Sequence, residues 1–203
     1  MEKENLLWIK ADEENTDNDI IEYELVDTDN NIYGSANVSI SYNLLVSYKS
    51  ASDISHDDMA QYVFRLIKIL NLKSYFKISK GTFAVGNNTL FLGDDAIQKC
   101  PDDMVFDFVL LSEDSSIKHW KWNVNGDLYA FRSNLQTVKE GITIQGCFHM
   151  QYTKIKEMNC TVGKDLIADK SDLISFNGIV EGHFLAYDKK FTQDDEGHVF
   201  IED

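Results

Sequence analysis

A change of hydrophobic period between residues 38 and 72 is the feature that most constrains how this chain folds. From Val38 to Tyr48 apolar and polar residues alternate, and this period of two predicts a β-strand with one buried face. Further along, apolar residues recur at helical spacing, at Met59, Val63, Leu66, Ile67 and Leu70. The chain therefore needs both a sheet and a helix that packs on it.

The helix is predicted over about residues 56–72, and both of its ends carry matching signals. Ser55 is placed to act as the N-cap, with Asp58 three residues later as in a capping box. Asp57 and Asp58 lie beside the positive end of the helix dipole, whereas Lys68 and Lys73 lie near its negative end. Local electrostatics thus agree with the hydrophobic period.

The remaining elements are predicted as strands. A strand at 20–26 is expected to join the strand at 38–48 through the turn at 27–31, and short strands are expected at 75–78, 82–85 and 89–92. After Pro101 we find no helical period, and we expect strands at 104–112, 117–124, 127–133, 142–152, 173–187 and 198–201. We find no internal repeat.

These elements predict an α+β fold in which β dominates, with antiparallel sheets and one amphipathic helix. We expect an acidic α+β region over residues 1–100 and an antiparallel β region over residues 101–203, which would be a sandwich or an open barrel. The two regions either share one core or have separate cores.

Asn125-Gly126 lies between two strand-like runs and predicts a type I′ hairpin turn, because both residues tolerate positive φ. In that register Trp122 faces Tyr129 and Trp120 faces Phe131, so four aromatic rings share one side of the sheet. We expect one of two roles for Trp120, Trp122, Tyr129 and Phe131: a core wall beneath a second sheet, or an exposed platform for a sugar ring or an extended peptide.

The chain is strongly acidic, with 34 acidic and 19 basic residues and a net charge of -15. Such a field repels phosphate, so we expect no nucleic-acid partner. Residues 1–60 alone contain 14 acidic and 3 basic residues. A field this uneven either keeps the protein in solution or steers a basic protein toward it.

From this asymmetry we predict a non-enzymatic protein that neutralises a basic protein partner, as an inhibitor or immunity protein does. The predicted contact residues are Asp12, Glu13, Glu14, Asp17, Asp19, Asp27 and Asp29. The alternatives are a ligand-binding module that uses the aromatic face and a structural or assembly subunit.

The sequence indicates neither export nor a membrane. No apolar run approaches the roughly 18 residues that a bilayer-spanning helix needs, and the first residues lack the pattern of a signal peptide. Cys100, Cys147 and Cys160 are an odd number at scattered spacings, which is typical of reduced thiols. We therefore expect a cytoplasmic protein.

Candidate catalytic and metal-binding groups are sparse. Cys147 and His149 share a face of the predicted strand 142–152, and Cys160, Glu181 and His183 join them as zinc ligands only if that strand neighbours 173–187. Glu181 beside His183 is also the arrangement that orients a general base, or else a plain surface pair.

Other motifs argue against bound ions and cofactors. The segment 27–31 imitates a calcium loop, but Ile32 and Val38 replace the required glycine and glutamate, which favours a hairpin turn. We find no nucleophile elbow and no phosphate-binding glycine loop. We therefore expect no cofactor. The sequence favours a protein that is not an enzyme, and the alternative is an enzyme whose site is centred on His183 and Glu181.

Overall fold

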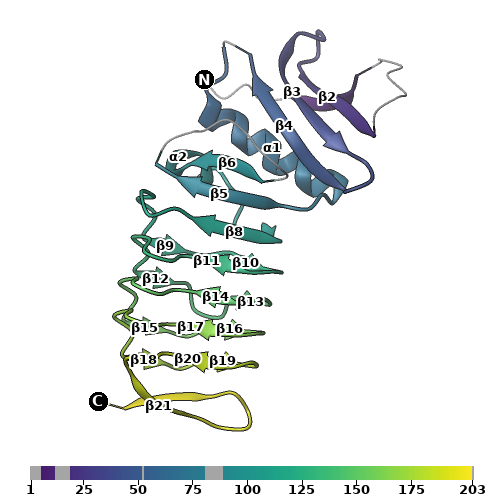
Figure 1. Cartoon of the computed structure of the whole chain (residues 1–203). Helices are drawn as coiled ribbons and strands as arrows, with labels where there is room; N and C mark the ends of the chain where they lie inside the picture. Colours follow the sequence, from purple (N-terminus) through teal and green to yellow (C-terminus); the bar gives the residue numbers. More distant parts are fainter. Residues whose placement is uncertain (1–5, 12–18, 52, 81–88, 203) are drawn as a thin grey trace.

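The chain forms an antiparallel sheet with a helix, followed by a β-solenoid whose coils stack along one axis (Figure 1). The structure is a computed structural model, and it describes residues 6–11, 19–51, 53–80 and 89–202. The predicted strand at 82–85 lies outside these residues.

The N-terminal sheet has four antiparallel strands in the order β1-β2-β3-β4. Their bounds are Leu7–Lys10, Ile20–Val26, Ile32–Ser39 and Leu44–Ser50. The strand predicted at 20–26 is confirmed. The single strand predicted at 38–48 is wrong, because a turn at 40–43 separates β3 from β4 and Asn43 there has a left-handed φ of 50°. An alternating pattern continues unbroken through a tight turn and does not reveal it.

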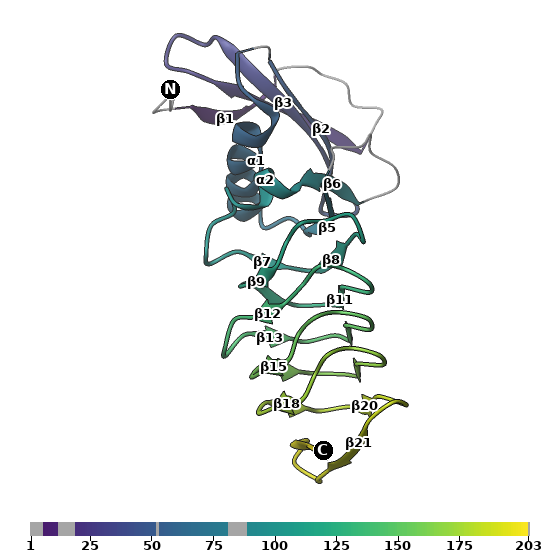
Figure 2. The same ribbon diagram turned by 90° about the vertical axis from the view of Figure 1, so that its left-hand side faces the viewer.

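The helix α1 spans His56–Leu70 and confirms the predicted helix. The Ser55 side chain accepts a hydrogen bond of 3.0 Å from the Asp58 amide, and the left-handed Asn71 ends the helix. The helix lies between the antiparallel sheet and the first coils of the solenoid (Figures 1 and 2). Its Phe64 ring lies 5.7 Å from Phe76 and 6.4 Å from Phe106, between centroids, so the helix closes the top of the solenoid core.

The solenoid begins before residue 101. Strand β5 (Tyr75–Ser79) pairs in parallel with β6 (Leu90–Gly93) and with β8 (Phe108–Leu111), and the short helix α2 (Asp94–Ile97) follows β6. Buried residues from both halves of the chain form one hydrophobic core. Among the described residues, α1 and α2 are the two helices, and neither is long and apolar enough to cross a membrane.

Each coil of the solenoid has three flanks made of very short parallel strands. The first flank contains β7 (Val105–Phe106), β10 (Asn123–Val124), β13 (Thr143–Ile144), β16 (Thr161–Val162) and β19 (Ile179–Val180). The second continues β6, β5 and β8 with β11 (Leu128–Tyr129), β14 (Phe148–His149), β17 (Leu166–Ile167) and β20 (Phe184–Leu185). The third contains the pairs β9 (His119–Trp120) with β12 (Thr137–Val138) and β15 (Glu157–Met158) with β18 (Ser175–Phe176).

The coils repeat in sequence as well as in space, so the prediction of no internal repeat is wrong. Buried apolar residues recur at intervals of 18 or 20 residues, at Val124, Ile144, Val162 and Val180 on the first flank and at Leu128, Phe148, Leu166 and Phe184 on the second. Equivalent positions of the coils share burial but not residue identity, so the repeat is not evident from residue identities alone.

The predicted antiparallel sandwich or barrel is therefore wrong, and so is the predicted hairpin. Val124 in β10 and Leu128 in β11 belong to different flanks, and each strand pairs in parallel with the coils above and below it. Gly126 instead allows the close approach of two coils, since a Cβ there would lie 2.1 Å from the Asp107 carbonyl oxygen of the preceding coil. Turn residues at a solenoid corner resemble those of a hairpin because both sites demand small residues.

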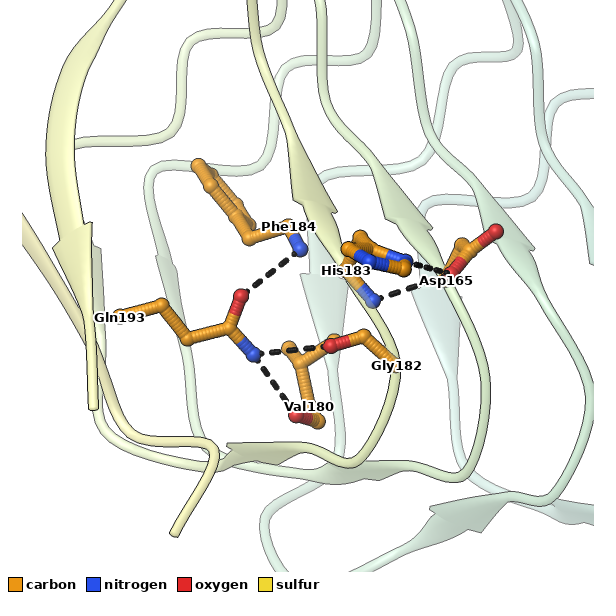
Figure 3. A network of polar contacts seen from close by, with 6 residues as sticks. All are labelled: Asp165, Val180, Gly182, His183, Phe184 and Gln193. Carbon is orange, nitrogen blue, oxygen red and sulfur yellow. Dashed lines mark hydrogen bonds and ion pairs between the residues drawn. The ribbon is translucent and has the colours of Figure 1, made fainter. Parts of the chain in front are cut away.

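Both ends of the solenoid are covered. At the C-terminal end the strands β21 (Lys190–Gln193) and β22 (Val199–Glu202) form an antiparallel hairpin under the last coil. Gln193 Nε2 donates to the carbonyl oxygens of Val180 and Gly182 at 2.9 and 3.0 Å (Figure 3). Such caps protect the last coil from pairing with another chain.

Candidate functional site

The outer corner that follows the second flank carries a repeated pair of outward-facing residues. The strand register aligns Ser112, Phe131, Gln151, Asp169 and Tyr187 in one column. The next residues along the chain form a second column, made of Glu113, Arg132, Tyr152, Lys170 and Asp188. We call these ten residues the corner groove.

Two depressions flank Phe131 in the corner groove. One has a volume of about 420 Å³ and is lined by Phe131, Gln151, Tyr152, Asp169, Lys170, Tyr187 and Asp188. The other has a volume of about 400 Å³ and is lined by Lys77, Leu110, Leu111, Ser112, Glu113, Asp114 and Phe131. Both volumes are typical of small-molecule sites. Because Phe131 is a wall of both, a ligand that fills the two depressions must pass over its ring.

Aromatic rings and cations hold one another in place along the corner groove. The Phe131 and Tyr152 rings meet edge to face, with their centroids 5.5 Å apart. The guanidinium carbon of Arg132 lies 4.9 Å from the Phe131 centroid and 5.2 Å from that of Tyr152. Lys170 Nζ lies 5.4 Å from the Tyr152 centroid. These contacts favour the observed ring positions although Phe131 is 38% exposed and Tyr152 is 41% exposed.

The backbone of the corner groove is unusual at three equivalent positions. Arg132, Tyr152 and Lys170 have left-handed φ values of 54°, 60° and 53°. This conformation costs an ordinary L-residue about 1–2 kcal/mol, and glycine or asparagine adopts it more readily. Among the described residues, the other non-glycine positions with left-handed φ are all asparagines: Asn30, Asn43 and Asn71.

Two polar atoms in the first column have no hydrogen-bond partner among the described residues. They are Gln151 Oε1 and Ser112 Oγ, both of which are buried. An unsatisfied buried polar atom costs about 1–3 kcal/mol, and most buried polar atoms in proteins are paired. Each of the two residues lines one depression, but the two atoms themselves are closed to solvent beneath the surface of the groove.

Carboxylates of the corner groove also tie neighbouring coils together. Asp169 Oδ1 accepts a hydrogen bond from the Tyr187 amide, and Asp188 Oδ1 accepts one of 2.9 Å from the Lys170 amide. Desolvation raises the pKa of Asp188, but the hydrogen bond from the Lys170 amide and the nearby Lys189 ammonium hold that pKa below its usual value overall. Both carboxylates thus present fixed acceptors to the groove.

A ladder of aromatic rings, which we call the aromatic ladder, runs beside the corner groove on the outer face of the second flank. It consists of Tyr75, Phe108, Tyr129 and His149, whose successive centroids lie 6.3, 5.5 and 4.1 Å apart. Burial raises the pKa of Tyr129. Burial also lowers the pKa of His149, an effect that outweighs the opposing influence of Asp127 and Asp165. The imidazole is thus favoured in its neutral form.

The four residues of the predicted aromatic platform do not share a face. Trp120 and Trp122 are 1% and 4% exposed inside the solenoid, and their Nε1 atoms donate to the carbonyl oxygens of Trp122 and Pro101 at 2.8 Å. Tyr129 and Phe131 lie outside, on the aromatic ladder and in the corner groove. The two tryptophans therefore belong to the core.

The predicted acidic contact residues are in part engaged in turns. Hydrogen bonds from Ser41 and Ser39 hold the pKa of Asp19 below its ordinary value. The Asn31 side chain, helped by other donors, lowers the pKa of Asp27 to about 2 and closes the hairpin turn between β2 and β3. Asp29 is exposed. The remaining four, at positions 12, 13, 14 and 17, lie outside the described residues.

The predicted zinc and general-base groups are separated. His183 Nδ1 contacts Asp165 Oδ1 at 3.3 Å (Figure 3). The charged partner of His183 is therefore Asp165, where the sequence predicts Glu181. Cys160 is buried, whereas His149 lies in β14 on the second flank and the half-buried Cys147 directly precedes that strand. Within the described parts of the chain, no three His, Cys, Asp or Glu side chains are grouped to hold a metal ion.

No protein-family model, curated protein or solved structure matches this chain. The function is therefore inferred from the chemistry of the surface.

Sequence reasoning missed the corner groove, although a signal for it exists. In three coils a buried residue is followed three positions later by a buried hydroxyl residue, as Ala130 by Ser133, Met150 by Thr153 and Ala168 by Ser171. In each coil the amide of the hydroxyl residue donates to the carbonyl oxygen of the first residue. The two residues between them belong to the groove.

Proposed function

We propose that the protein is a ligand-binding module whose ligand lies in the corner groove, along the solenoid axis. The observation that carries this proposal is the left-handed backbone at Arg132, Tyr152 and Lys170. Glycine and asparagine adopt a left-handed φ at the lowest conformational cost, as Asn30 and Asn43 do in their turns. Other residue types that hold this conformation do so at a cost, and such strained positions indicate a functional role.

The chemistry of the groove supports the same proposal. Exposed rings at Phe131 and Tyr152 offer apolar contact. The carboxylates of Asp169 and Asp188 line the same depression and offer hydrogen-bond acceptors. An apolar depression with a few converging polar groups is the usual form of a binding site. Binding of a basic protein through the acidic region remains a prediction from charge alone.

The test is a ligand-observed NMR screen of saccharides, short peptides and nucleosides against the full chain and two variants. Phe131→Ala removes the ring shared by both depressions, whereas Ile174→Ala removes a 63% exposed side chain outside the corner groove. We expect at least one compound whose saturation-transfer signal disappears with Phe131→Ala and persists with Ile174→Ala. Compounds that bind both variants equally, or no binding at all, would refute the proposal.

A further inference from the structure

We propose that the ligand of the corner groove is a linear, uncharged oligosaccharide whose successive sugar rings lie over successive coils. This inference rests on the proposed function and adds the class of ligand. It combines four observations: the repeat of the site, its rings, its polar atoms and its charge.

The site repeats at the spacing of the coils. Adjacent strands of a sheet lie about 4.8 Å apart, so the column from Ser112 to Tyr187 spans four steps, or about 19 Å. One column position follows another in a straight line because the strands of the second flank are in parallel register. A ligand built from repeated units fits such a row better than a compact molecule does.

The rings of the groove suit the apolar faces of sugars. Tyr187 is 91% exposed, and together with Phe131 and Tyr152 it distributes aromatic surface over three coils. A flat ring presents a rigid apolar surface that loses little conformational entropy on binding. The C–H faces of a pyranose ring are the complementary apolar surface.

The polar atoms suit hydroxyl groups. The carboxylates of Asp169 and Asp188 line the groove as acceptors and are held in place by backbone amides of neighbouring coils. Carboxylate oxygens accept more than one hydrogen bond, and sugar hydroxyls donate, so such hydroxyls can pair with both groups.

The charge of the groove selects against ionic polymers. Its three carboxylates, at Glu113, Asp169 and Asp188, nearly balance the cations at Arg132 and Lys170. Arg132 is also 3.7 Å from a Glu113 oxygen, so its charge is partly compensated. The net charge of -15 on the whole chain repels polyanionic glycans.

An extended peptide is a poorer fit, because peptides commonly bind by adding a strand to a free sheet edge. The strands β8, β11, β14 and β17 are already paired on both sides, and the Gln193 side chain caps the outer edge of β20. The groove also crosses these strands and does not run along one of them. The backbone of a peptide in the groove would therefore lie beside no free strand edge with which it could form a ladder of hydrogen bonds.

The experiment is isothermal titration of the full chain with cellohexaose, xylohexaose, mannohexaose and the fully N-acetylated chitohexaose, alongside hexagalacturonate and a proline-rich peptide. We expect at least one uncharged hexaose to bind, with its affinity falling as the oligosaccharide is shortened to the dimer. Tyr187→Ala should weaken that binding by about tenfold or more, since an exposed ring is lost without disturbing the core. Tyr42→Ala, which removes a 64% exposed ring from the antiparallel sheet, should leave it unchanged.

Two other outcomes separate this inference from the proposed function. If only the peptide or hexagalacturonate binds, and Phe131→Ala abolishes that binding, the groove is a binding site but the oligosaccharide inference is overturned. If no probe binds, or binding is unaffected by both Phe131→Ala and Tyr187→Ala, this inference is overturned and the NMR screen decides the proposed function on its own.

Discussion

Gln193 Oε1 accepts a hydrogen bond of 3.1 Å from the backbone amide of Phe184, so a side chain of the C-terminal hairpin replaces the coil that would otherwise pair with β20 (Figure 3). The Nε2 atom of the same amide donates to the Val180 and Gly182 carbonyl oxygens. One side chain thus satisfies three backbone groups at the open end of the solenoid.

We expect Gln193→Ala to lower the free energy of unfolding by about 1–3 kcal/mol, because it leaves these backbone groups without partners. Gln145→Ala is the control, since Gln145 is an exposed glutamine between β13 and β14, away from the capped end of the solenoid. It should change stability by less than about 0.5 kcal/mol. Urea denaturation measures both, and equal effects of the two variants would contradict the capping role.

Replacing Lys170 by asparagine should stabilise the fold while weakening ligand binding. The variant relieves a left-handed φ of 53° but loses the contact between Lys170 and the Tyr152 ring, so the expected net gain is about 0.5 kcal/mol. Asn30→Lys is the reverse substitution in the β2–β3 turn, and it should cost about 1 kcal/mol. Chemical denaturation tests both signs, and a destabilised Lys170→Asn variant would remove the main support for the proposed function.

One of the three thiols should react in the native protein. Burial raises the pKa of Cys160 to about 12 and raises the pKa of Cys100 far above its usual value, whereas Cys147 is half-buried. The reactive species is the thiolate, so the two buried cysteines should resist disulfide exchange until the chain unfolds. With Ellman's reagent we expect one fast equivalent, which Cys147→Ser removes, and three equivalents in denaturant. Rapid reaction of all three in the native state would show that the solenoid core is open.

His149 should make stability depend on pH in the weakly acidic range. Its pKa is lowered by burial in the folded state, so the unfolded chain binds the proton more readily. This contribution to stability is fully present above the pKa of the unfolded imidazole, about 6.5, and is lost as the pH falls from there toward the lower folded value. In His149→Phe, which retains a ring against Tyr129, the loss of stability between about pH 7.5 and about pH 5.5 should be smaller than in the parent chain. Identical losses in urea titrations would exclude His149 as the source.

Signals that are local in sequence predicted structure correctly. The helix α1 could be predicted because Ser55, Asp58 and the apolar residues of its buried face lie within five turns of one another. The strand β2 was equally clear. Both elements are specified by residues that are neighbours along the chain.

The solenoid could not be predicted in this way, because its decisive contacts join residues 18 or 20 positions apart. Strands of two residues are too short to show a period, and the segment around Asn125-Gly126 has the composition of a hairpin. What distinguishes the two folds is the parallel pairing of Val124 with Ile144 and of Leu128 with Phe148. A single coil cannot bury its apolar residues alone, so the fold is a property of the stack.

The sequence predicts part of the candidate site. The hairpin register predicts that all four aromatic rings share one face, as a core wall or as an exposed platform. In the structure Trp120 and Trp122 lie in the core, whereas Tyr129 and Phe131 lie on the outer surface. The residues aligned with Phe131, such as Gln151 and Asp169, are distant in sequence and carry no motif. Only the coil register brings them together.

Because each coil contributes one step to the corner groove, the length of this surface is set by the number of coils. An in-frame duplication of a single coil would lengthen it by one step and leave α1 and the Gln193 clamp where they are. Insertion or deletion of a whole coil, more than substitution of single residues, would therefore change the length of this surface.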